Sequence, residues 1–159
     1  MSTVIDASAL IAFLRDEPGA DVVENVLSAP EKCYAHALNL CEVYYDFFRA
    51  SNQDAAEAAI SDLLGLGIED RTDMDSEFWR DVGGLKAVHR RVSLADCCAL
   101  ALARRLGDGG AEKWGHYGRE KGASDVVTLW PAAGETGPDV NWRCLQVEWF
   151  SADFAFSAR

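Results

Sequence analysis

The sequence has few positive charges and no long hydrophobic run. Its 159 residues include 15 Lys and Arg against 26 Asp and Glu, which gives a formal net charge of −11. This balance argues against a protein that holds nucleic acid through a broad basic surface, because such affinity comes mostly from neutralising phosphates. An enzyme that contacts nucleic acid through a local basic patch is compatible with it. No stretch of about 18 apolar residues occurs, so no membrane-spanning helix is expected.

Cysteine patterns typical of metal or disulfide frameworks are also missing. The five cysteines are odd in number and form no Cys-x-x-Cys pair, so neither a zinc site nor a disulfide framework is indicated. We expect reduced cysteines packed as small apolar residues in a cytoplasmic protein. The first 14 residues have no basic region ahead of their apolar run and carry Asp6 inside it, which argues against a signal peptide.

Short apolar strands and amphipathic helices alternate through residues 1–106. We expect strands at 3–5, 33–35 and 68–70, and helices at 7–15, 20–27, 38–50, 54–64, 76–89 and 94–106. This pattern predicts an α/β fold with a small, mostly parallel sheet flanked by helices. The length suits one domain, which we expect to span residues 1–159.

Residues 107–159 differ in composition from this core. Eight of the 13 glycines lie between Gly107 and Gly137, and four of the five tryptophans lie beyond residue 113. Helical periodicity fades there, and strands are expected only at 125–130 and 145–150. We therefore expect an atypical Gly- and Trp-rich tail after the core.

Three acidic residues lie on otherwise apolar elements. Asp6 follows a buried-type strand, Glu42 lies in an apolar helix, and Asp96 has no basic helical neighbour. Each alone has an ordinary explanation, as a turn former, a partly exposed residue and a capping acid respectively. Since unpaired buried carboxylates are costly, three of them on three elements indicate a shared site.

Carboxylates gathered in one place repel each other unless a positive charge lies between them. Oxygen ligands without Cys or His suit Mg²⁺ or Mn²⁺, which activates water and stabilises charge on a phosphoryl group. Asp6 also stands at the carboxyl end of a strand, where open α/β sheets bind their ligands. The residues thus indicate a metal-dependent phosphoryl-transfer site.

Three segments together resemble the PIN-domain ribonucleases, and in particular the VapC-type toxins of toxin–antitoxin pairs. They are 4–14 around Asp6, 39–45 around Glu42 and 92–101 around Asp96. The resemblance covers residues 1–106. It implies a PIN-like three-layer fold and an endoribonuclease that needs Mg²⁺ or Mn²⁺ to hydrolyse phosphodiester bonds in single-stranded RNA.

The resemblance also implies residue roles. Asp6 and Asp96 would be the principal metal ligands, and Glu42 a further ligand or the holder of a water on the metal. Ser8 would hydrogen-bond near Asp6 and steady it, although a hydroxyl at a helix start explains Ser8 equally well.

Arg90 and Arg91 belong to a basic cluster, with Lys86 and His89, just before the third acid. The cluster would hold RNA phosphate, although such a run is more commonly a solvated basic face.

A fourth acid is the point where the sequence departs from the family, which places one soon after the Asp96 helix at the end of a strand. The nearest match is Asp153, which follows the apolar run 145–150 but lies 57 residues beyond Asp96. Asp125 precedes its apolar run instead of following it. The remaining alternative is that the tail supplies no fourth acid.

The partners implied are RNA, a cognate antitoxin protein and a second copy of the chain, with no membrane. Apolar surface on helices 20–27 and 38–64 would suit the protein contacts. The candidate anchors are Tyr44, Tyr45, Phe47 and Phe48. The alternative function is a catalytically impaired PIN-like protein-interaction module.

Overall fold

The computed structural model describes residues 2–107, 125–131 and 142–146, the last two ranges by their backbone only. The elements are β1 (Ser2–Ile5), α1 (Ala7–Leu14), α2 (Ala20–Leu27), β2 (Lys32–His36), α3 (Ala37–Ala50), α4 (Gln53–Gly65), β3 (Ile68–Arg71), α5 (Ser76–Val88), α6 (Leu94–Gly107), β4 (Asp125–Pro131) and β5 (Trp142–Gln146). The expected strands and helices of the first 107 residues are confirmed, with ends displaced by a residue or two.

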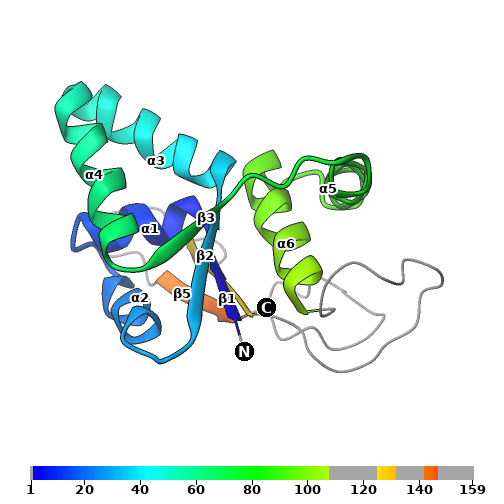
Figure 1. The fold of residues 1–159 in the computed structure, drawn as a ribbon, viewed down its shortest axis with the longest axis horizontal. Helices are drawn as coiled ribbons and strands as arrows, with labels where there is room; N and C mark the ends of the chain where they lie inside the picture. The colour runs from blue at the N-terminus through cyan, green and yellow to red at the C-terminus, as the bar shows by residue number, and fades with distance from the viewer. Residues whose placement is uncertain (1, 108–124, 132–141, 147–159) are drawn as a thin grey trace.

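The strands form one mostly parallel sheet, as predicted, in the order β3-β2-β1-β4-β5. β1 pairs in parallel with β2 and β4, β2 pairs in parallel with β3, and only β5 runs antiparallel. The carboxyl ends of β1 to β4 therefore meet at one edge of the sheet, which we call the carboxyl edge. α1 and α3 begin directly after β1 and β2 at this edge, and α6 begins at the same end of the molecule (Figure 1).

Helices cover both faces of the sheet, which confirms the three-layer α/β fold. Alternate strand residues point to opposite faces. Ile5 and Cys33 pack in the core cluster that α1, α2, α3 and α4 complete, whereas Val4 and Tyr34 pack in the cluster of α5 and α6. The order of the side chains along β1 thus fixes which face each helix layer covers.

Capping residues set most of the helix starts. The side chains of Asp6, His36, Asn52 and Asp75 each accept a hydrogen bond from a backbone N–H in the first turn of α1, α3, α4 and α5 respectively. After α4 the backbone turns through Gly67 at a φ of +91°, a conformation that favours glycine.

The strand predicted at 145–150 is confirmed at residues 145 and 146, but it begins three residues earlier than expected. β5 begins at Trp142, opposite Pro131 of β4, and ends at Gln146, opposite Val127. Antiparallel pairing with β4 therefore fixes the strand earlier than the apolar run suggests. Residues 147–150 lie outside the described ranges. The expectation of one domain over 1–159 stays a prediction.

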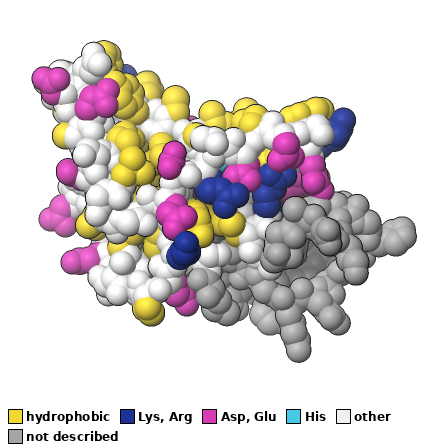
Figure 2. Space-filling model, viewed as in Figure 1, with side chains coloured by type: hydrophobic (Ala, Val, Ile, Leu, Met, Phe, Trp, Pro, Cys, Tyr) yellow, Lys and Arg dark blue, Asp and Glu magenta, His cyan; other side chains and the backbone are white. Residues whose placement is uncertain are grey.

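Exposed hydrophobic side chains gather on α3 and α5. Tyr45 and Phe48 of α3 and Trp79 of α5 are each about half exposed, and Figure 2 shows hydrophobic side chains along the upper rim of the molecule over these two helices. None of the helices described is both long enough and apolar enough to cross a membrane.

Candidate active site

Asp6 is a buried acid at the carboxyl edge of the sheet, with 1% of its surface exposed. It is the N-cap of α1, and its Oδ1 accepts hydrogen bonds from the backbone N–H of Ala9 at 2.9 Å and from the hydroxyl of Ser8 at 2.8 Å. Asp6 therefore does have the local structural role that its position in the sequence suggests, as the cap of α1. The same two bonds also fix the orientation of the carboxylate, because Ser8 donates to the oxygen that caps the helix.

Glu42 lies on the second turn of α3 and is half-buried. Burial, and then the negative charge of Asp96, raises the pKa of the Glu42 carboxyl above its usual value. α3 contacts α6, the helix that carries Asp96. Glu42 and Asp96 therefore come close enough across this helix pair for their charges to repel.

Asp96 forms a reciprocal capping box with Ser93 at the start of α6. Its Oδ2 accepts from the backbone N–H of Ser93 at 3.1 Å, and the Ser93 hydroxyl accepts from the Asp96 backbone N–H at 3.1 Å. The cap fixes the side chain at the end of α6 that lies toward the carboxyl edge. Its structural role thus also holds the carboxylate where it meets the charge of Glu42.

These three acids are brought to one end of the sheet but are not drawn into a preformed metal cage. Within residues 2–107 and the two described strands, no group of three or more His, Cys, Asp or Glu side chains is close enough to hold a metal ion. The donor chemistry does fit a hard divalent cation, because all three side chains are carboxylates and two of them repel. A cation placed among them would offset that repulsion.

The basic cluster before α6 divides into a structural residue and exposed residues. Lys86 donates from Nζ to the backbone carbonyls of Arg90 and Val92, so it braces the α5–α6 loop. Arg90 and Arg91 are exposed on that loop, six and five residues before Asp96. This loop leads into the end of α6 that carries the acid.

The described part of the tail brings no acid beside Asp6. β4 lies next to β1, and its register pairs Thr3 with Asp125 and Ile5 with Val127. Asp125 is thus at the opposite edge of the sheet, and Thr128 takes the register position beside Asp6. Asp153 lies outside the described residues. The sheet nevertheless continues past β1, because β4 and β5 add two strands on that side.

Two polar residues that the sequence analysis did not use are buried beside this edge. His36 caps α3, accepting from the Leu38 N–H at Nδ1, and its Nε2 lies 2.9 Å from the carbonyl of Asp73. Asn39, one turn before Glu42, is fully buried. The signal for Asn39 is its position between Leu38 and Leu40 in an otherwise apolar helix.

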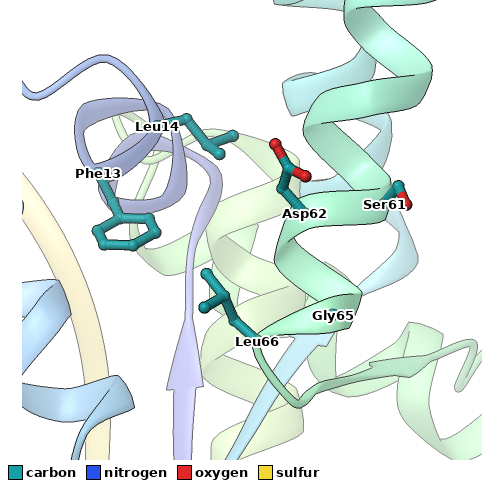
Figure 3. Close-up of a pocket in the computed structure, with 6 residues that line it drawn as sticks. All are labelled: Phe13, Leu14, Ser61, Asp62, Gly65 and Leu66. Atoms are coloured by element: carbon teal, nitrogen blue, oxygen red, sulfur yellow. The ribbon is translucent and has the colours of Figure 1, made fainter.

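A surface hollow of about 510 Å³ lies elsewhere, between the ends of α1 and α4 (Figure 3). Its lining residues are Phe13, Leu14, Ser61, Asp62, Gly65 and Leu66. Phe13 and Leu14 lie at the opposite end of α1 from Asp6. At a rise of 1.5 Å per residue, Leu14 is roughly 12 Å from Asp6 along the helix. The hollow is therefore separate from the acidic residues.

Comparison with solved structures defines the class of fold. VapC20 of Mycobacterium tuberculosis, described as a sarcin–ricin loop cleaving toxin, matches with a TM-score of 0.55 and 18% identity over 67% of this chain and 84% of that chain. VapBC2 from Rickettsia felis, bound to a DNA fragment from its promoter, matches with a TM-score of 0.51 and 10% identity over 69% of this chain and 84% of that chain. At these identities the likeness shows the fold alone.

The sequence itself identifies the family. The family model of the PIN domain matches residues 3–109, which is most of the described core. No curated protein sequence matches the chain. The chain belongs to the PIN domain family, and the resemblance noted from its three acidic segments is confirmed.

Proposed function

We propose that this chain is an endoribonuclease that depends on Mg²⁺ or Mn²⁺ and serves as the toxin of a toxin–antitoxin pair. The observation that supports the proposal most is the charge repulsion between Glu42 and Asp96 in a PIN fold whose Asp6 lies at the same end of the sheet. Perturbed carboxylates of this kind concentrate at functional sites.

The acids would divide the work according to their surroundings. Asp6 and Asp96, each held by a helix cap, would be the principal ligands of the cation. Glu42 would complete its ligands or orient a water beside it. Ser8 would position Asp6 through the hydrogen bond to Oδ1. When bound, the cation supplies an activated water and offsets the charge of the scissile phosphate.

The RNA would be held locally by Arg90 and Arg91. These two exposed cations precede α6 in a chain whose formal net charge is −11. Their contacts with phosphate would position the strand near Asp96 without the broad basic surface that tight binding requires.

The proposed protein partners are a cognate antitoxin and a second copy of the chain. The exposed aromatic rings of Tyr45 and Phe48 support an interface on α3. Of the other two candidate anchors, Phe47 packs against the core beneath the Arg15 guanidinium, and Tyr44 hydrogen-bonds Glu57. The acidic exterior favours a basic antitoxin surface.

Cleavage of RNA by the purified chain tests the proposal. We expect cleavage with Mg²⁺ or Mn²⁺, none with chelator, and at least a roughly 100-fold loss of rate in Asp6→Asn, because even residues that only support metal ligands cost 10- to 100-fold. Asparagine caps helices as well as aspartate does, so the variant should fold. Asp54→Asn, an exposed acid in the first turn of α4, is the matched control and should cleave normally.

The same assay addresses the fourth acid and the alternative function. A loss in Asp153→Asn equal to that in Asp6→Asn would assign the fourth acid to the tail, and full activity would remove Asp153 from the site. Intact RNA under all metal conditions, from a folded chain, would contradict the nuclease and favour the interaction module.

A further inference from the structure

We propose that Asn39 is a positioning residue of the acid site, whose carboxamide hydrogen-bonds a site carboxylate and the water shell of the bound cation. This inference rests on the proposed function and extends it to a residue that is not an acid. It starts from the burial and the hydrogen bonding of a single side chain on α3.

The carboxamide of Asn39 is buried without hydrogen bonds. The residue has 0% of its surface exposed, and neither Oδ1 nor Nδ2 has a hydrogen-bond partner among the residues that the structure describes. The large majority of buried polar side-chain atoms are hydrogen-bonded, and an amide that loses both interactions with water is costly to fold. An aliphatic residue would fill this position without that cost.

Asn39 lies one turn before Glu42 on the same side of α3. It lies in the first turn of α3, which starts where β2 ends at the carboxyl edge. Helical side chains lean toward the N-terminus of their helix, so the side chain of Glu42 extends over the turn that contains Asn39. The next turn on the same side, at Val43, is fully buried in the apolar core.

An amide suits this position better than a carboxylate or an apolar group. Its Nδ2 donates two hydrogen bonds and its Oδ1 accepts, so it can bind a carboxylate and a water together. It does so without adding a negative charge next to Glu42 and Asp96, which already repel. The Asn39 amide lacks hydrogen-bond partners without the cation, and it would gain them when the cation binds.

Replacement by leucine, whose side chain has the same branched arrangement of heavy atoms, separates this role from a structural one. We expect the full-length Asn39→Leu chain to keep or gain resistance to urea without metal, because an unpaired buried amide is removed. Its Kd for Mn²⁺, measured by calorimetry, should rise about 10- to 100-fold. Val43→Ala on the same helix is the control, with a lower urea midpoint and an unchanged Kd.

A second variant tests the same inference through charge. Asn39→Asp should lower the urea midpoint of the metal-free chain by adding a buried carboxylate, and Mn²⁺ should restore it. The Asn39→Asp experiment tests the role of Asn39 even if the Asn39→Leu variant fails to fold. A midpoint that Mn²⁺ does not restore would overturn the inference.

The two failures are distinguishable. If the wild-type chain binds no Mn²⁺, the proposed metal dependence is wrong and the role of Asn39 falls with it. If the wild-type chain binds Mn²⁺ and Asn39→Leu binds it with the same Kd, the inference about Asn39 alone is wrong.

Discussion

Two groups of acids lie at opposite ends of α6, and the protein treats them differently. At the start of the helix, Asp96 meets the charge of Glu42. At its end, Arg105 pairs with Asp73 at 3.0 Å and with Asp75, while Arg71 pairs with Asp73 at 2.9 Å. We call Arg71, Asp73, Asp75 and Arg105 the arginine clamp. Figure 2 shows basic and acidic side chains side by side on this face of the molecule, below the rim of hydrophobic side chains.

The pKa of Glu42 shifts in the opposite direction to the pKa values of Asp73 and Asp75. Burial opposes ionisation of Asp73, but hydrogen bonds from Arg71 and Arg105 lower its pKa overall. The hydrogen bond from Arg105, followed by that from the Phe78 N–H, lowers the pKa of Asp75. Burial and Asp96 instead raise the pKa of Glu42. Ionisation thus stabilises the fold at the clamp and opposes it at the acid site.

The arginine clamp and the acid site differ in how their negative charge is neutralised. The chain neutralises the clamp acids with its own arginines, and the Arg105 guanidinium also lies over the Phe78 ring at 5.0 Å. Among the residues that the structure describes, no Lys or Arg forms an ion pair with Glu42 or Asp96. The charge is therefore neutralised from within at one end of α6, and at the other end it is open to the cation that we propose.

Removal of Arg105 should have the largest effect on stability. Arg105→Ala leaves Asp73, which is mostly buried, without one of its two cations and exposes the Phe78 ring. We expect a loss of about 2–3 kcal/mol in the free energy of unfolding, somewhat below the 3–5 kcal/mol for breaking a fully buried pair. Urea denaturation measures it.

Lys32→Ala is the matched control for Arg105. Its ion pair with Glu69 spans 2.9 Å but is exposed on both sides, so we expect a change below about 0.5 kcal/mol. Equal losses of stability in Arg105→Ala and Lys32→Ala would contradict the contrast between the clamp and the acid site. The clamp would then contribute no more than an exposed surface ion pair.

Acid should weaken the clamp next. Because the folded pKa values of Asp73 and Asp75 lie below their unfolded values, the stability they contribute is fully present above about pH 4–5. It is lost as the pH falls through the folded pKa values. The wild-type chain should thus lose stability more steeply below about pH 4 than Arg105→Ala. Urea midpoints at pH 3 to 7 test this, and parallel curves would contradict it.

The sequence predicts the fold well wherever local signals act alone. Capping residues such as Asp75 and Ser93 mark the starts of helices, and these starts do not depend on contacts with distant segments. β5 is the counterexample, because its position depends on pairing with β4, which no local pattern reports. An apolar run shows that a segment is suited to a strand but does not show where its partner begins.

The sequence points to the acids of the candidate site but not to its neutral residue. Asp6, Glu42 and Asp96 stand out because a carboxylate on an apolar element is costly. Asn39 carries no charge, and it draws attention only when the packing shows both amide atoms buried without hydrogen bonds. Lys86 shows the reverse, because a basic residue that suggests phosphate binding is occupied by backbone carbonyls.

Neutralising Glu42 should give the smallest and most specific effect. The folded pKa of Glu42 is raised, so its ionised form opposes folding, and this penalty appears as the pH rises from about 4.3, the unfolded value, through the folded value. Glu42→Gln should therefore be more stable than the wild type at pH 7, and equally stable near pH 4. Since the side chain is only half-buried, screening limits the gain to a few tenths of a kcal/mol.

Mn²⁺ should reverse the order of the two chains, because the cation stabilises the wild type through a charge that Glu42→Gln lacks. Glu24→Gln on the exposed surface of α2 is the matched control. A Glu42→Gln chain that is less stable than the wild type at pH 7 without metal would mean that the acid site is neutralised from within, as the clamp is. The contrast between the two ends of α6 would then be lost.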